Sequence, residues 1–110
     1  MATGRLGNLD VGSTSYTDLY TVPADTFAVA SVSLVNRTSS GITVRVAVTT
    51  TSGGVGSPNL SEFIEYDVTI APKGVLERTG LVLDAGKIIS VYASATGISA
   101  VAMGIETSTA

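Results

Sequence analysis

Three acidic side chains lie close together in the sequence and are the first candidates for chemistry. They are Glu62, Glu65 and Asp67. Residues two apart share one face of a regular strand, so Glu65 and Asp67 are expected to point the same way. Such a face could bind Ca²⁺ or act as an acid/base pair. Because no loop dense in Asp, Asn and Gly accompanies them, we favour a solvated face or salt bridges to Arg45 or Arg78 across a subunit boundary.

The composition argues against most catalytic chemistry. The chain has no Cys and no His, so it offers no thiol nucleophile and lacks the commonest general base and metal ligand. Its formal net charge is −3 and its six basic residues are scattered, which argues against binding a phosphate backbone. We therefore predict that the protein is not an enzyme, has no cofactor or metal, and binds no nucleic acid.

The tyrosines and one charged pair offer binding chemistry. Tyr16, Tyr20, Tyr66 and Tyr92 could stack on sugar rings, although packing in a core or at a rim is the more frequent use of Tyr. Tyr16 and Tyr20 are expected to share one face of a strand. Arg78, which follows an acidic residue in an apolar stretch, could anchor an interface through its planar guanidinium.

The elements that would position these residues read as strands. Residues 26–36 alternate, and Ala28, Ala30, Val32 and Leu34 are expected to face inward. Residues 42–51 give the cleanest period of two in the chain. Segment 36–41 is a turn, so the two runs are predicted to form a hairpin.

The rest of the chain follows the same pattern. Residues 87–94 and 98–106 are predicted to form a closing hairpin around a short Gly-containing loop. A first strand is expected over 15–22 and a flexible loop over 52–59. Further strand character covers three short segments: 60–70, 75–78 and 81–83. In the first of these we expect a bulge near Ile64 and Glu65, with a short helix over 60–65 as the alternative.

These patterns predict one all-β domain, an antiparallel β-sandwich or jelly-roll-like fold of seven to eight short strands. The domain is expected to span residues 15–106, between an extended N-terminal arm over 1–14 and a small polar tail over 107–110. Leu6 and Leu9 favour an arm that reaches a neighbouring subunit, because they would not be left in water without cause.

Targeting and surface composition add two expectations. The first twenty residues lack the pattern of a signal peptide and no apolar run reaches the length of a membrane span, so we expect folding in a cytoplasm and no membrane contact. Only 14% of residues are charged. A surface largely covered by neighbours and a small domain solvated by Ser and Thr explain this equally well.

Five sequence segments carry a family resemblance: residues 18–24, 32–37, 64–67, 74–80 and 101–106. With them, most of the chain from Ser15 onward resembles small virion structural proteins of tailed bacteriophages, particularly those of cyanobacteria. The resemblance implies a β-sandwich displayed on a particle, usually as a trimer or in higher symmetric copy. Head decoration (cement), a collar or neck spike, and a tail-fibre module all fit, and no family active site exists to transfer.

Our leading hypothesis is a capsid decoration protein that binds and stabilises the assembled shell. It would be a homo-oligomer, with a trimer favoured, located on the virion and partnered by the major capsid protein or another virion protein. The alternative is a collar-spike or tail-fibre module that binds a host receptor or glycan through Tyr16, Tyr20 and loop 52–59. The residues expected at interfaces are Leu6, Leu9, Tyr16, Tyr20, Arg45, Glu65 and Arg78.

Overall fold

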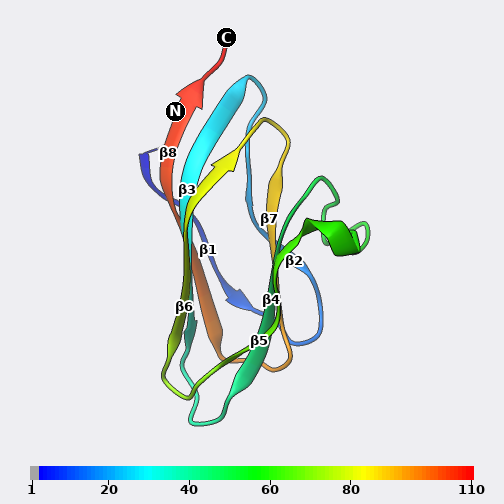
Figure 1. The fold of residues 1–110 in the computed structure, drawn as a ribbon, viewed down its shortest axis with the longest axis vertical. Coiled ribbons are helices and arrows are strands. Elements are labelled where there is room, and N and C mark those ends of the chain that lie inside the picture. Colours follow the sequence, from blue (N-terminus) through cyan, green and yellow to red (C-terminus); the bar gives the residue numbers. More distant parts are fainter. Residues whose placement is uncertain (1–2) are drawn as a thin grey trace.

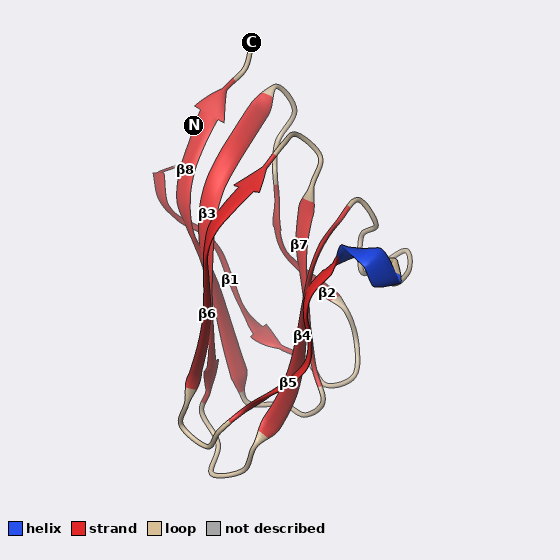
Figure 2. Cartoon of the chain, in the orientation of Figure 1, coloured by secondary structure: helices blue, strands red, loops and turns tan. Residues whose placement is uncertain are grey.

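In the computed structural model, which describes residues 3–110, two four-stranded antiparallel sheets pack face to face (Figure 1). Colouring by secondary structure shows strands throughout and one short helical turn beside them (Figure 2). The all-β sandwich prediction is confirmed. The strands are β1 (Thr3–Val11), β2 (Thr17–Thr21), β3 (Thr26–Asn36), β4 (Ile42–Thr49), β5 (Phe63–Ile70), β6 (Val75–Leu83), β7 (Ile88–Ala93) and β8 (Ile98–Ser108), with a 3₁₀ turn, η1 (Leu60–Glu62), before β5.

The order of the strands is that of a jelly roll. One sheet runs β1-β8-β3-β6 and the other β2-β7-β4-β5. Strand pairs β1–β8, β2–β7, β3–β6 and β4–β5 are all antiparallel. The chain thus behaves as one long hairpin, folded back between β4 and β5 and then rolled so that successive strand pairs fall in alternate sheets.

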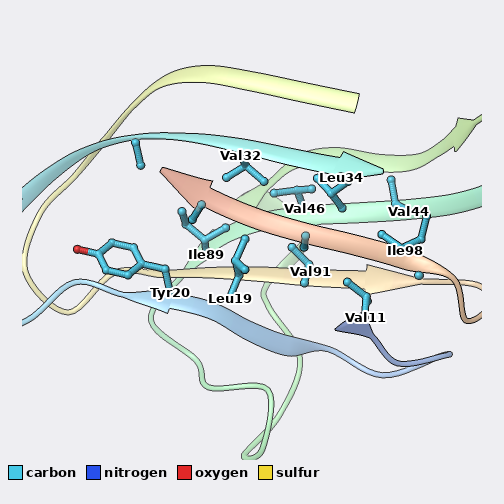
Figure 3. Packing of buried hydrophobic residues seen from close by; sticks show 14 of the residues in the cluster. Val11, Leu19, Tyr20, Val32, Leu34, Val44, Val46, Ile89, Val91 and Ile98 are labelled. Atoms are coloured by element: carbon cyan, nitrogen blue, oxygen red, sulfur yellow. The ribbon is translucent and has the colours of Figure 1, made fainter. Parts of the chain in front are cut away.

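Small aliphatic side chains fill the space between the sheets. The inward residues of β3, namely Ala28, Ala30, Val32 and Leu34, are at most 1% exposed, as their alternation predicted. Residues of β8, the neighbouring strand, and of β4 and β7 in the facing sheet pack against them (Figure 3). Because these side chains are short or β-branched, they suit a thin core between two pleated surfaces.

Both predicted hairpins are wrong. Residues 26–36 and 42–49 form β3 and β4, which lie in different sheets, and β7 and β8 are separated in the same way. A short loop between two strands is compatible with a hairpin within one sheet and with a crossing between two sheets. Here burial of both inner faces decides for the crossing, because a flat hairpin would leave one apolar face in water.

The N-terminal segment is also different from the expected arm. Residues 3–11 form β1, which pairs along its length with β8, and its last residue, Val11, is only 1% exposed. Leu6 and Leu9 are half-buried and pack against the core of their own chain. Met1 and Ala2, the start of the expected arm, lie outside the described residues. At the other end, the expected tail begins inside β8, which continues to Ser108.

Three other predictions concern the segment before β5 and bulges in β5 and β6. The expected bulge near Ile64 is confirmed, because the register of β4 with β5 shifts there. The alternative helix is present only as η1, where the Glu62 carboxylate accepts a hydrogen bond from the Asn59 N–H at 2.7 Å. The two short strands expected over 75–78 and 81–83 are one strand, β6, with a bulge beside Gly80. Gly80 has a φ of 70°, which suits glycine.

Candidate binding surfaces

The outer face of the β2-β7-β4-β5 sheet carries a cluster of aromatic rings around one arginine. Arg45 points outward because its neighbours Val44 and Val46 are completely buried. It pairs in register with Tyr92 of β7, so both side chains stand on the same face. The cluster, which we call the aromatic face, consists of Tyr16, Arg45, Phe63, Tyr66, Asp67 and Tyr92.

Arg45 is fixed by both stacking and hydrogen bonds. Its guanidinium carbon lies 4.3 Å from the ring centroid of Tyr66 and 4.7 Å from that of Tyr92. Its Nε donates to Asp67 Oδ1 at 2.6 Å, and another guanidinium nitrogen donates to the Tyr16 hydroxyl at 2.8 Å. The hydrogen bond to Asp67, followed by that to Tyr16, raises the pKa of Arg45 further above its usual range. The side chain is therefore permanently charged and holds the rings of Tyr16, Tyr66 and Tyr92 in place.

The rings contact one another in tilted and edge-on geometries. Tyr16 lies 4.9 Å from Tyr92 and 6.0 Å from Phe63, measured between ring centroids. Phe63 and Tyr66 meet edge to face at 4.9 Å. Tyr66 is 49% exposed, so one ring of the cluster is open to solvent. Such a surface can pack on an apolar ligand or sugar ring and offers hydroxyls and the Asp67 carboxylate as polar partners.

Loop 50–62 lies next to the aromatic face and is held there by hydrogen bonds to Asp18 of β2. The Asp18 carboxylate accepts hydrogen bonds from the Ser52 hydroxyl and the Gly53 N–H, each at 2.8 Å. Gly53 packs against the backbone of Tyr16 so closely that a Cβ atom there would overlap the Tyr16 carbonyl. Beyond this anchor, Val55 is 86% exposed, so the tip of the loop projects an apolar side chain into solvent.

The outer face of the other sheet is apolar. Val29 of β3 pairs with Val82 of β6 on one side and with Ile105 of β8 on the other. These three side chains and Met103 are between 40% and 73% exposed. We call this surface, Val29, Val82, Met103 and Ile105, the apolar face. Large apolar residues gathered across three neighbouring strands are typical of a surface that another molecule covers.

The structure separates the carboxylates that were expected to share a face. Asp67 lies at a bulge with a φ of 53° and turns outward to Arg45. Glu65 turns toward the gap between the sheets, where its Oε2 accepts a hydrogen bond from Arg78 of β6 at 3.0 Å. The prediction of a shared face is wrong, because a bulge shifts the alternation by one residue. The expected partners Arg45 and Arg78 are right, but the salt bridges form within the chain.

Tyr20 is not at the surface. A bulge at Leu19 breaks the register of β2 with β7 and turns both Leu19 and Tyr20 inward, leaving Tyr20 8% exposed. Its hydroxyl donates to Glu106 of β8 at 2.5 Å, which links the two sheets. Burial, followed by this hydrogen bond, raises the pKa of Tyr20 well above its usual range. The expectation that Tyr16 and Tyr20 share a face is therefore wrong.

Of the seven residues expected at interfaces, Tyr16 and Arg45 come together on the aromatic face, and Glu65 and Arg78 form a salt bridge between the two sheets. Sequence reasoning missed that Phe63, Tyr66 and Tyr92 gather around Tyr16 and Arg45, and missed the whole apolar face. A signal for the latter existed, because Val29 alternates with the inward residues Ala28 and Ala30 and so had to face outward. Among residues 3–110 there is no group of three side chains able to hold a metal ion, no pocket, and no helix long and apolar enough to cross a membrane.

Comparisons of the chain with protein-family models, with curated proteins and with solved structures give no match.

Proposed function

We propose that the chain is a non-catalytic structural protein of a bacteriophage particle, acting as a capsid decoration protein that binds the assembled shell. The observation that carries the proposal is the apolar face, which marks the chain as a subunit of a larger protein assembly. Val82 is 73% exposed and Ile105 54%, and both stand beside Val29 on a rigid sheet. A surface of this kind is stabilised when a protein partner removes it from water.

The fold and the family resemblance support the same role. The jelly-roll order of strands occurs in viral capsid domains and also in lectins, so it supports the proposal only as an analogy. A decoration protein that binds the assembled shell and not the free subunit stabilises the shell by mass action. Many copies on one particle let weak individual contacts sum to firm attachment. The partners proposed are further copies of the chain and the major capsid protein, on the virion.

The proposal is tested on purified particles. Quantitative mass spectrometry of virions banded in a density gradient should find the chain at a fixed ratio to the major capsid protein. Stripping it off should lower the temperature at which the particles release DNA, and adding back the purified protein should restore that temperature. Met103→Glu, which puts a charge on the apolar face, should fail to restore it, whereas Val55→Glu on the loop tip should succeed. Absence of the chain from banded virions would contradict the proposal.

A second candidate function is binding of a host glycan by a spike or fibre module, and the aromatic face favours it. Tyr66 is half-exposed beside a charged and hydrogen-bonded Arg45, which gives a ring surface with polar groups at its edge. A glycan array probed with the purified protein tests this. Binding that is lost in Tyr66→Ala and kept in Tyr20→Phe, whose ring is buried, would support the glycan function over shell decoration.

A further inference from the structure

The apolar face is flanked by two charges that have no partner among residues 3–110. Arg5 stands on β1, opposite Met103, and Glu77 stands on β6, opposite Ser33. Both are exposed, and neither makes an ion pair or hydrogen bond within residues 3–110. Because β1 and β6 are the two outer strands of this sheet, a positive charge borders one edge of the apolar face and a negative charge borders the other.

We propose that the occupant of the apolar face is a second copy of this chain, packed face to face about a two-fold axis that runs parallel to the strands. Such an axis places β1 of one copy over β6 of the other. Arg5 then faces Glu77 of the second copy, and symmetry makes the pair twice. Registers put Arg5 level with Ser31 and Glu77 level with Ser33, an offset of about 7 Å along the strands that a long Arg side chain can span.

The charge pattern selects this axis over the other face-to-face arrangement. A two-fold axis perpendicular to the strands would place β1 over β1 and β6 over β6. Like charges would then come to the same edge of the contact, which is unfavourable. Only the axis along the strands joins opposite charges at both edges.

The apolar side chains are complementary under the same rotation. It places β3 of one copy over β8 of the other, at the same level along the strands. Val29 therefore faces Ile105, which is its own neighbour in register, and Met103 faces the small side chain of Ser31. A long side chain opposite a short one on each of two symmetric positions is the arrangement that closely packed sheet faces use.

The size of the sheet is sufficient for such a contact. Four strands cover about 19 Å across, and nine residues of strand cover about 30 Å along, so the face measures roughly 570 Å² on each copy. The two copies together would cover about 1,140 Å², just below the roughly 1,200–2,000 Å² of stable interfaces and within the range of weaker specific contacts. The contact makes pairs, and so differs from the trimer that the family resemblance implies.

Sedimentation equilibrium of the full chain tests the proposal. The wild type should be a dimer. Arg5→Glu or Glu77→Arg alone should raise the dimer Kd about tenfold, because each creates two like-charge contacts. The double variant Arg5→Glu/Glu77→Arg should return the Kd to within about threefold of wild type. Met103→Glu should give monomers, and Val55→Glu, at a more exposed position off the face, should leave the dimer unchanged.

Several results would overturn it: a monomer at all concentrations, a trimer, or a double variant no better than the single ones. Circular dichroism of each variant separates loss of association from loss of folding. The inference rests on the proposed function only in taking the apolar face as a protein contact. If the chain forms the dimer but is absent from virions, the proposed function is contradicted and the inferred contact stands. If the chain is present in virions but is a monomer in solution, the inferred contact is contradicted and the proposed function stands.

Discussion

Asn36 gives the sharpest single test of how the sandwich is held together. Its side chain is completely buried and ties two turns at one end of the fold. The Nδ2 group donates to the carbonyls of Ser40 at 2.7 Å, Ile70 at 3.0 Å and Ala71 at 3.3 Å. The Oδ1 atom accepts from the N–H of Thr38 at 2.9 Å and from its hydroxyl at 2.7 Å. One side-chain amide thus supplies hydrogen-bond partners to backbone groups in the turn after β3 and in the turn after β5.

Asn36→Ala should lower the free energy of unfolding by about 2–4 kcal/mol. The Ile70 carbonyl accepts its bond in the buried interior, so leaving it without a donor costs about 1–3 kcal/mol. The remaining carbonyls and the Thr38 N–H are only partly buried and can reach water, so their lost bonds add about 1 kcal/mol in total. A loss of this size is a large part of the 5–15 kcal/mol typical of a small domain.

Asn36→Asp separates hydrogen bonding from packing, because the two side chains have nearly the same shape. The introduced carboxyl keeps the acceptor for Thr38 but replaces the donor with an oxygen that faces three carbonyls. The folded state should prefer the neutral form, which raises the pKa of the carboxyl above its value in the unfolded chain. The stability associated with the neutral form is present below the unfolded pKa and is lost as the pH rises through the folded pKa.

Urea unfolding at pH 4 and pH 7 measures the effect. Asn36→Asp should be at least as unstable as Asn36→Ala at pH 7, and the difference from wild type should shrink at pH 4. Asn8→Asp, on the exposed face of β1, is the matched control and should change little at either pH. A variant within about 0.5 kcal/mol of wild type at pH 7, or a difference that does not depend on pH, would refute the role assigned to Asn36.

Three further predictions concern the candidate surfaces and the core. Gly53→Ala should lower stability by about 1–3 kcal/mol because its Cβ would overlap the Tyr16 carbonyl, whereas the adjacent Gly54→Ala should be nearly neutral; equal melting temperatures would contradict the contact. Arg45→Lys should lower the free energy of unfolding by about 1–2 kcal/mol, because an ammonium cannot both stack on the rings and reproduce the planar hydrogen bonding of the guanidinium. An unchanged urea midpoint would argue against this role of Arg45. The raised pKa of Tyr20 means that its contribution to stability is complete below pH 10 and is lost as the pH rises further; Tyr20→Phe should flatten that alkaline fall, and a parallel fall in both proteins would exclude the phenol as its source.

Local alternation predicted the faces of single strands well, and predicted their partners poorly. The inward set of β3 follows from a period of two that no bulge interrupts before Asn36. The same rule failed at Tyr20 and at Asp67, where one extra residue turns a side chain to the opposite face. Bulges carry no fixed sequence signature here, so the faces beyond them could not be predicted from spacing.

The candidate surfaces required information that the sequence does not display locally. The outward direction of Arg45 follows from its position between two buried valines. Its partners Tyr16, Asp67 and Tyr92 come from three other segments, and only the register of β4 with β5 and β7 brings them together. Pairing over such sequence separations is set by the packing of the whole sandwich, and a hairpin rule applied to neighbouring strands predicts the wrong partners.

The rolled hairpin also explains why the molecule has two outer faces of different chemistry. Neighbouring strands in the sequence mostly fall in opposite sheets, so each outer face is assembled from distant segments. The aromatic face draws on residues near 16, 45, 66 and 92, and the apolar face on residues near 29, 82 and 104. A core of small aliphatic residues separates the two, and no side chain belongs to both. The proposed pairing would cover the apolar face with a second copy and leave the aromatic face open to a different molecule.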